Sequence, residues 1–367
     1  MSPHAELTDL VLDDLARLVS VESPSRDIDA ITRSAETVAG LIAERTGRPA
    51  TLVDGPAGPH VHWSGGGEPR VLVLGHHDTV FPLGTLAARP FTVDGGRATG
   101  PGVFDMKAGI VQGIHAVASL DDASGVELLF SSDEEIGSDT SRALIEQRAL
   151  ACGAVLVLEP AADGGALKTG RKGVGTFEVV VHGRAAHAGL EPEKGVNALI
   201  EASHQVLVIA GFGSSEHGTT VTPTVAAAGT AENVVPAEAR IKVDVRVQEH
   251  GEKARVEAAM ASLGPVDPDA SIEVRGSINR PPMPESASAT LFPLALQVDP
   301  SLLGVAVGGG SDGNFTAAVG VPTLDGLGAV GGGAHADHEY VEIDAMRGRI
   351  RLLAGILTQL CTSARPT

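Results

Sequence analysis

The segment VLVLGHHDTVFP, residues 71–82, is an apolar run that ends abruptly in His76, His77 and Asp78. A buried strand normally excludes such groups, because an unpaired polar or charged side chain is costly to bury. Along an extended strand, residues i and i+2 point to the same side, so His76 and Asp78 converge while His77 points away. An H-x-D pair by itself is equally typical of a capped strand end with a hydrogen-bonded histidine, so its meaning depends on the rest of the chain.

Other strand-like segments also end in acidic residues. Asp105 follows GRATGPGVF, Glu134 and Glu135 follow LLFSSD, and Glu159 follows AVLVL. Open α/β sheets place their ligand sites at the carboxyl ends of the strands, so these carboxylates are expected to gather beside His76. Clustered carboxylates are costly unless a cation neutralises them. Imidazole and carboxylate groups without a thiolate favour zinc, cobalt or manganese.

The pattern along the chain predicts two domains. After amphipathic helices up to about residue 47, short apolar strands alternate with helices, which is typical of an α/β domain with a mainly parallel sheet covered by helices. From about residue 172, segments such as TFEVVVHG and EARIKVDVRVQ alternate apolar and polar residues, and the order β-α-β-β-α-β predicts a ferredoxin-like unit. We therefore predict a discontinuous catalytic domain at 1–171 and 282–367, with an inserted domain at 172–281.

The composition excludes several classes of partner. The chain carries 46 acidic and 27 basic residues, a formal net charge of −19, and a surface without a concentrated basic face repels nucleic acid. No run approaches the roughly 18 apolar residues of a membrane span, and the first residues lack the basic and apolar regions of a signal peptide. The two cysteines, Cys152 and Cys361, form no disulfide framework. These features predict a cytoplasmic protein with no nucleic-acid or membrane partner.

Five motifs occur in order along nearly the whole chain: HHD, GPGVFDMKAG, SSDEEIGS, LEP and GGGAHADHEY. With them the chain resembles the dinuclear-zinc metallopeptidases and amidohydrolases that include glutamate carboxypeptidase, aminoacylase and succinyl-diaminopimelate desuccinylase. The segments GHHDTVFPLGT and HAGLEPEKGVNAL are most similar to the glutamate carboxypeptidase branch. The resemblance implies that the α/β domain carries the metal ions and that the inserted ferredoxin-like domain acts as a lid and a dimerisation domain.

The resemblance also implies a ligand set for two divalent metal ions, Zn²⁺ first, with Co²⁺ or Mn²⁺ as alternatives. Asp105 would bridge the two ions, His76 and Glu159 would complete one site, and Glu135 and His335 would complete the other. His335 lies in a Gly-rich loop, where a lone histidine is otherwise usually solvated. The resemblance further implies a cis peptide bond directly after Asp105.

Three residues receive catalytic roles from the resemblance. Glu134 is expected to shuttle the proton of the attacking water, because neighbouring residues point apart and Glu135 is the ligand. Asp78 is expected to orient His76 through its carboxylate, the usual support of a ligating imidazole. His187, in RAAHAG of the inserted domain, is expected to donate to the oxyanion of the tetrahedral intermediate. Without the resemblance, His187 would be interpreted as a packed or solvated histidine.

The inserted domain and the segment after it supply candidate substrate contacts. Arg246 in VDVRV, Asn233 in AENVVPA and Arg280 in SINRPPM match positions with which the family grips a substrate carboxylate, a task that suits a bidentate guanidinium. Arg246 lies on the polar face of an alternating strand and could equally be a solvated surface charge. Lys168, Arg171 and Lys172, in LKTGRKGVG, are further cationic candidates or simply solvate the hinge. Gly310, in GGGSDGNF, is expected in a turn beside the substrate, although these glycines could serve backbone geometry alone.

These observations predict a metal-dependent hydrolase that cleaves an amide bond in a small peptide or N-acyl amino acid and releases a C-terminal amino acid, as glutamate carboxypeptidase does. The preferred released residue is left open. An aminoacylase-like deacylase is the alternative within the hydrolases, and a non-catalytic metal-binding protein is a third hypothesis, which predicts a missing ligand or base. The resemblance also implies a homodimer in which the inserted domains pair and His187 reaches the metal ions of the partner subunit.

Overall fold

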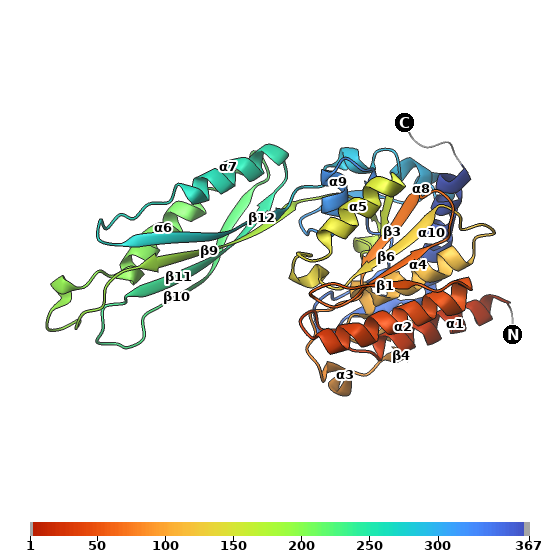
Figure 1. Ribbon diagram of the computed structural model, residues 1–367, viewed down its shortest axis with the longest axis horizontal. Helices are drawn as coiled ribbons and strands as arrows, with labels where there is room; N and C mark the ends of the chain where they lie inside the picture. Colours follow the sequence, from red (N-terminus) through yellow and green to blue (C-terminus); the bar gives the residue numbers. More distant parts are fainter. Residues whose placement is uncertain (1–2, 363–367) are drawn as a thin grey trace. The chain divides into compact units, whose positions relative to one another are not determined.

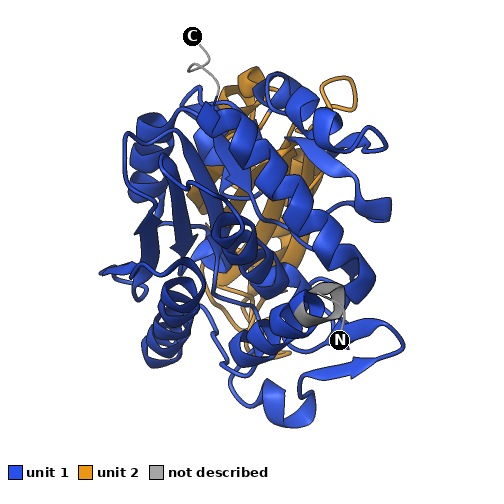
Figure 2. Ribbon diagram, turned by 90° about the vertical axis from the view of Figure 1, so that its right-hand side faces the viewer, with its two compact units in different colours: residues 1–170, 284–307, 311–367 blue, residues 171–283, 308–310 orange. Residues whose placement is uncertain are grey.

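The computed structural model describes residues 3–362, which form two compact units (Figure 1; Figure 2). Unit 2 comprises Arg171–Met283 and Gly308–Gly310, and unit 1 comprises the rest of the described chain. The expected insertion at 172–281 therefore starts one residue later and ends two residues earlier than the long segment of unit 2. The short segment Gly308–Gly310, which the expected boundaries place in the catalytic domain, packs with unit 2 instead.

The core of unit 1 is a six-stranded, mainly parallel sheet, which confirms the predicted α/β class. In sheet order, the strands are β1 (Thr51–Val53), β2 (His60–Ser64), β6 (Val126–Ser131), β3 (Val71–His76), β7 (Val155–Val157) and β14 (Thr323–Leu324). Every residue of β3, β6 and β7 is buried. The unbroken apolar runs of the sequence are thus the strands covered on both faces.

Helices cover both faces of this sheet. Val71 and Val73 of β3 belong to the large core that also contains α1, α2, α4 and α10, whereas Leu72 and Leu74 pack with α5 on the opposite face. The helices of unit 1 are α1 (Pro3–Val19), α2 (Ile28–Thr46), α3 (Thr85–Ala88), α4 (Ala108–Ala118), α5 (Arg142–Cys152), α8 (Phe292–Val298), α9 (Gly313–Ala318) and α10 (Ile343–Thr362). Within residues 3–362, no helix combines the length and the apolar character that crossing a membrane requires.

A smaller sheet of unit 1 brings two distant segments together. Its antiparallel strands are, in order, β15 (Gly331–Gly332), β16 (Tyr340–Glu342), β5 (Arg97–Thr99) and β4 (Thr92–Asp94). Tyr340, the first residue of β16, pairs with Thr99, the last residue of β5. The chain after β5 and the chain before β16 therefore leave the same end of one antiparallel pair. These two loops contain Asp105 and His335. A further pair of strands is formed by β8 (Leu167–Arg171) and β13 (Gly304–Val307).

Unit 2 has the predicted β-α-β-β-α-β order of a ferredoxin-like domain. Its elements are β9 (Gly173–His182), α6 (Ala198–Ala210), β10 (Thr220–Ala228), β11 (Glu238–Val247), α7 (His250–Ala261) and β12 (Ser271–Arg280). The strands form an antiparallel sheet in the order β10-β11-β9-β12. One face of the sheet, with Val179, Ile241 and Val243, packs with residues of α6 and α7. The polar residues that alternate with them form the other face.

Asp14 of α1 joins three helices of unit 1. Arg45 of α2 donates Nε and Nη2 to the two carboxylate oxygens of Asp14 at 2.7 and 2.6 Å, and His115 Nε2 of α4 lies 2.8 Å from Oδ2. Burial alone would raise the pKa of Asp14, but the contacts with Arg45 and His115 lower it to about 2. This stabilisation is present above the unfolded pKa of about 3.9 and is lost as the pH falls towards 2.

We expect Asp14→Asn to lower the free energy of unfolding by about 3 kcal/mol at pH 7, because the guanidinium of Arg45 then faces an uncharged amide. The difference between the variant and the wild type should shrink at pH 3. Urea unfolding at the two pH values measures both effects. Asp13→Asn, on the exposed side of the same helix, is the matched control, and an equal loss in both variants would contradict the prediction.

Candidate metal centre

The carboxyl ends of β3, β6 and β7 lie at one edge of the main sheet. Their parallel register pairs His76, the last residue of β3, with Ser131, the last residue of β6, and β7 runs along the other side of β3. The acidic residues that follow β6 and β7 therefore emerge beside His76. This local topology explains why Glu135 and Glu159, which are distant in sequence, reach the same imidazole.

Asp105 comes to this edge from a turn at Val103–Lys107 that leads into α4. Gly109 allows the helix to begin close to the end of β7, because a Cβ there would lie only 2.3 Å from the carbonyl oxygen of Leu158. The peptide bond between Asp105 and Met106 is cis, which confirms the prediction. The turn thus delivers the Asp105 carboxylate between the other strand ends.

Asp105 lies between two groups of candidate ligand atoms. Its Oδ1 is 3.3 Å from His76 Nε2, which is also 3.5 Å from Glu159 Oε1. Its Oδ2 is 3.3 Å from His335 Nε2, which is also 3.2 Å from Glu135 Oε2. The structure therefore brings all five predicted ligands together in unit 1, with one oxygen of Asp105 directed to each group.

Glu134, the predicted proton shuttle, lies beside the first group. One of its carboxylate oxygens forms a cluster with ligand atoms of His76 and Glu159 in which all the atoms lie within 4.8 Å of one another. Only 8% of the Glu134 surface is exposed. A buried carboxylate at this place can exchange a proton with a group that is held by the neighbouring ligands.

The closest contact of Asp78 with His76 is through its backbone oxygen, and not through the predicted carboxylate. His76 Nδ1 lies 3.0 Å from the backbone oxygen of Asp78 and 3.4 Å from its carboxylate Oδ1. The Asp78 carboxylate also accepts the backbone N–H groups of Glu134 and Glu135, each at 3.2 Å. Asp78 therefore fixes His76 mainly through its main chain, and its side chain ties the end of β3 to the loop of the two glutamates. The ring of His77 points away, towards α2 and the segment before β2.

His335 has a left-handed backbone conformation, with φ of 62°. This conformation is costly for a residue with a side chain and is typical of functional sites. Arg89 supports the loop, because its Nη1 donates to the backbone oxygen of Ala336 at 3.3 Å and its guanidinium lies 4.5 Å from the ring centre of Phe81. The His335 side chain is 51% exposed, so the centre opens to solvent here. His338, in the same loop, is also exposed.

The charges of the centre favour a cation. Hydrogen bonds with Asp105 and Glu135 raise the pKa of His335 to about 10. Burial opposes the charged form of His76, but its contacts with Asp105 and other carboxylates hold the pKa well above the usual value. Burial also opposes ionisation of Asp105, yet the two histidines hold its pKa below the usual range. Each imidazole is thus drawn towards positive charge by the carboxylates around it.

Two oxygens of the centre lack a donor. Asp105 Oδ1 and Glu135 Oε1 are buried and accept no hydrogen bond from the part of the chain that the structure describes. A buried anionic oxygen without a donor is costly. Carboxylate oxygens together with imidazole nitrogens form a donor set that zinc, cobalt and manganese accept. The residues present therefore fit divalent metal ions.

Two buried charged residues outside the predicted site hold its loops in place. Glu339 accepts backbone N–H groups of the Asp105 turn, and burial raises the pKa of its carboxyl group to about 7. Arg349 of α10 donates Nε to the backbone oxygen of Gly328 at 2.8 Å. The N–H of Gly328 in turn donates to the backbone oxygen of Glu159 at 2.9 Å. Glu339 therefore contacts the main chain of a candidate ligand directly, and Arg349 is linked to one through Gly328.

His187 and Asn233 lie in paired segments of unit 2. A β-bridge and a backbone hydrogen bond of 2.9 Å to the Asn233 oxygen join the two segments, and both residues are exposed. Nδ1 of His187 accepts the backbone N–H groups of Gly189 and Leu190 at 3.1 and 3.2 Å. In the neutral ring the proton therefore lies on Nε2, which is the donor that the ring presents.

Arg246 and Arg280 lie in one row across the sheet of unit 2, because both pair with Val174 of the strand between them. Arg246 donates Nε and Nη2 to the two carboxylate oxygens of Asp244 at 3.0 and 2.9 Å. Its guanidinium is therefore oriented by a neighbour on the same strand. Arg280 is buried, with 8% of its surface exposed.

Gly310 belongs to the short segment that packs with unit 2. Arg171 Nη1 donates to the backbone oxygens of Gly309 and Gly310, each at 3.1 Å. Only 5% of the Arg171 surface is exposed. Of the two interpretations of Arg171, hinge solvation is contradicted, because this buried residue binds the backbone of the glycine segment.

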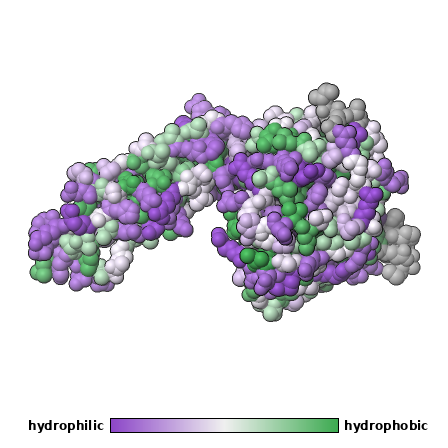
Figure 3. Space-filling view, viewed as in Figure 1, coloured by the Kyte–Doolittle hydropathy of each residue, from purple (hydrophilic) through white to green (hydrophobic). Residues whose placement is uncertain are grey.

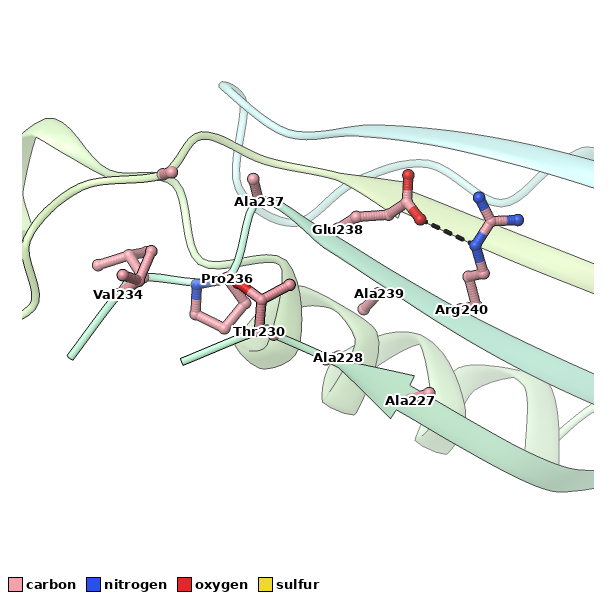
Figure 4. A pocket seen from close by; sticks show the side chains of 12 residues that line it. Ala227, Ala228, Thr230, Val234, Pro236, Ala237, Glu238, Ala239 and Arg240 are labelled. Carbon is pink, nitrogen blue, oxygen red and sulfur yellow. Dashed lines mark hydrogen bonds and ion pairs between the residues drawn. The ribbon is translucent and has the colours of Figure 1, made fainter. Parts of the chain in front are cut away.

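A cavity of about 310 Å³ lies at the end of β10 and the start of β11 (Figure 4). Its lining includes Val234, which is bridged to His187. Most of the lining residues are small or apolar, and Figure 4 shows the two charged ones, Glu238 and Arg240, hydrogen-bonded to each other at 2.8 Å. Since these charges already satisfy one another, we assign no chemistry to this cavity.

Comparisons with known proteins extend over most of the chain. The model of Peptidase family M20/M25/M40 matches residues 72–359. Carboxypeptidase G2 from Pseudomonas sp. (strain RS-16) is 31% identical, and the alignment covers 95% of this chain and 89% of that relative.

Solved structures share the fold. A metallo-carboxypeptidase of the M20 family from Sulfolobus solfataricus superposes with a TM-score of 0.76 at 17% identity, covering 95% of this chain and 99% of that one. A dinuclear metal-binding peptidase of the M20 family from Bacillus subtilis gives a TM-score of 0.66 at 17% identity, covering 98% of this chain and 99% of that one. At such identities the likeness establishes the fold alone.

Proposed function

Because this chain belongs to Peptidase family M20/M25/M40 and is a metal-dependent hydrolase of the carboxypeptidase type, we propose that it cleaves the amide bond next to a free carboxylate and releases a C-terminal amino acid. One observation carries the proposal. The two oxygens of Asp105 are directed to two separate ligand groups, each of which contains one histidine and one further carboxylate. This arrangement suits a pair of metal ions that share one bridging carboxylate.

The proposed cofactor is a pair of divalent ions, Zn²⁺ first, with Co²⁺ or Mn²⁺ as alternatives. His76 and Glu159 would hold one ion, Glu135 and His335 the other, and Asp105 both. Two such ions supply Lewis acidity that activates water and polarises the scissile carbonyl. A non-catalytic metal-binding protein would be expected to lack one of the ligands or the base. This set lacks none of them.

Glu134 is the proposed proton carrier. Its buried carboxylate can take the proton of the attacking water and return it to the leaving nitrogen. Asp78 keeps Glu134 in place through the 3.2 Å hydrogen bond to its backbone N–H. A carboxylate that moves a proton twice must keep one position through both transfers, and this backbone anchor supports such a role.

His187 is the proposed donor to the oxyanion. With Nδ1 occupied by two backbone N–H groups, the ring offers Nε2–H to a developing negative charge. His187 is exposed in unit 2, and we assign its action to the metal centre of the partner subunit. Asn233, on the paired segment, is proposed to assist substrate binding there.

The proposed assembly is a homodimer formed through unit 2. On α6, the side chains of Leu199, Ile200, Leu207 and Val208 are 50, 58, 75 and 45% exposed, and Figure 3 shows apolar surface in this part of unit 2. The adjacent strand β10 is an edge of its sheet. A second copy related by a two-fold axis would pair with this edge and cover the apolar helix face, which supports the dimer.

The proposed location is the cytoplasm. Both cysteines, Cys152 and Cys361, are free thiols. Reduced thiols are typical of proteins in that compartment, whereas exported proteins more often pair them.

Arg246 is the proposed grip on the free carboxylate of the substrate, with Arg280 and Gly310 as further contacts. Asp244 already orients its guanidinium, so little ordering is left for the substrate to bring about. We expect Arg246→Ala to lower kcat/KM about 30- to 100-fold for an N-blocked amino acid, because a charge-assisted hydrogen bond is lost. The same variant should change little for the methyl ester of that substrate, which lacks the charge.

Steady-state kinetics on the acid and its ester, with metal-loaded protein, tests this proposal. Arg240→Ala, on the same strand and at an exposed position, is the matched control. Equal turnover of acid and ester by the wild type would show that the substrate needs no free carboxylate. A panel of peptidyl and N-acyl amino acids separates the proposed carboxypeptidase from the aminoacylase-like alternative, which predicts that the acyl compounds are turned over faster.

A further inference from the structure

Glu339 is buried, with 1% of its surface exposed, between the His335 loop and β16. Its Oε1 accepts the backbone N–H groups of Phe104 and Asp105, each at 2.8 Å, and its Oε2 accepts the N–H of Gly102 at 2.9 Å. One carboxylate thus satisfies three donors of the turn that presents Asp105.

The turn needs such an acceptor. It closes when the N–H of Lys107 donates to the oxygen of Gly102 at 2.9 Å, and the N–H groups of Gly102, Phe104 and Asp105 converge on one point. Gly102 permits this path with φ of 72°. Converging backbone N–H groups form an anion-binding nest, and leaving them unpaired in the interior would be costly. Glu339 is the acceptor in this nest, although it lies 234 residues after Asp105 in the sequence.

The same segment carries His335. The chain from Gly333 to Glu339 folds into a tight loop. In this loop the N–H of Ala336 donates to the Gly333 oxygen at 2.9 Å, and the N–H of Glu339 donates to the Ala336 oxygen at 3.2 Å. One carboxylate therefore links the Asp105 turn to the segment that carries His335. Asp105 Oδ2 and His335 Nε2, 3.3 Å apart, lie at the two ends of this link.

We propose that Glu339 is a positioning residue that sets Asp105 relative to His335 and thereby controls the affinity of one metal site, the one formed by Asp105, Glu135 and His335. The proposal rests on the proposed function, because it presupposes two metal ions. Residues that orient metal ligands from behind typically change metal affinity by about 10- to 100-fold when replaced. The site of His76 and Glu159 shares Asp105, but its other two ligands are held by the backbone oxygen of Asp78 and the N–H of Gly328, so its affinity should change less.

Metal titration of the full-length, metal-free protein tests this inference without an activity assay. Co²⁺ absorption and calorimetry give the affinity of each site, and Glu135→Gln identifies the spectral band that belongs to the His335 site. We expect Glu339→Gln to weaken that site about 10- to 100-fold and the other site less than about 3-fold. Glu339→Asp keeps the charge but withdraws it by one methylene group, so it should give a smaller loss at the same site.

Glu342→Gln, three residues further along at an exposed position of β16, is the matched control and should bind both ions like the wild type. Unchanged affinities in Glu339→Gln, or an equal loss at both sites, would overturn the inference, since a purely structural role makes no distinction between the sites. If Glu339→Gln does not fold, the test uses Glu339→Asp. A loss of affinity confined to the His335 site would support the inference, and an equal loss at both sites would overturn it. Failure of the wild type to bind two ions would instead refute the proposed function, and this inference with it.

Discussion

Replacing Glu134 with alanine is expected to lower kcat by about 10⁴-fold while leaving the metal content unchanged. The expected loss is at the upper end of the range for general acid–base catalysis, about 10²–10⁴-fold, because one carboxylate is asked to move the proton in both directions. Metal content should persist because the five candidate ligands do not include Glu134. Turnover under saturating substrate, together with elemental analysis of the same preparation, measures both quantities.

Asp139→Ala is the control for this experiment, since Asp139 lies in the same loop and is exposed. It should retain wild-type turnover. Substantial kcat in Glu134→Ala would remove Glu134 from the role of proton carrier. Loss of metal together with activity would reassign Glu134 to the ligand set.

The second large effect is expected at His187. Removal of one oxyanion donor typically costs about 10²–10³-fold in kcat, and we expect a loss of this size in His187→Ala. If His187 acts on the partner subunit, a heterodimer of Glu134→Ala and His187→Ala has one active site with both lesions and one with neither. An equal mixture that exchanges subunits freely should then recover about a quarter of the wild-type activity, because half the dimers are mixed.

The control for this complementation is a mixture of Glu134→Ala with Glu135→Ala. Both lesions lie in unit 1, so every active site of their heterodimer carries one of them, and no activity should return. Subunit exchange can be followed independently with two fluorescent labels. Demonstrated exchange without recovery in the His187 mixture would place His187 in its own subunit's site or outside catalysis.

The arrangement of the centre could be predicted from sequence to the extent that local rules position it. His76 and Asp78 share a side because a strand alternates, and Glu135 and Glu159 follow strands whose unbroken apolar runs predict burial. The closest contact of Asp78 to His76 could not be foreseen, because a backbone oxygen is present at every residue and leaves no trace in the sequence. The pairing of Arg246 with Asp244 could have been predicted from the same alternation, because residues two positions apart on a strand point to the same side.

The supports behind the centre depend on tertiary contacts and escaped prediction for that reason. Glu339 looks like an ordinary loop acid until the pairing of β5 with β16 brings it to the Asp105 turn. Arg349 offered one signal, since it falls among the apolar residues of α10 near Met346 and Leu353, where a solvated charge is unexpected. The transfer of Gly308–Gly310 to unit 2 has no such signal, because three glycines carry no pattern.

The split of unit 1 around unit 2 has a consequence for the order of events during synthesis. Asp105 leaves the ribosome 234 residues ahead of Glu339, an interval of roughly 10–50 s at about 5–20 residues per second. Throughout that time the nest of the Asp105 turn lacks its acceptor and the other ligands lack His335. Nearly all of unit 2, from Arg171 to Met283, emerges within the interval as one continuous piece. Its folding can therefore finish before the sheet of unit 1 receives β14 and its core receives α10, and the nascent chain can complete the metal centre only after His335 has emerged.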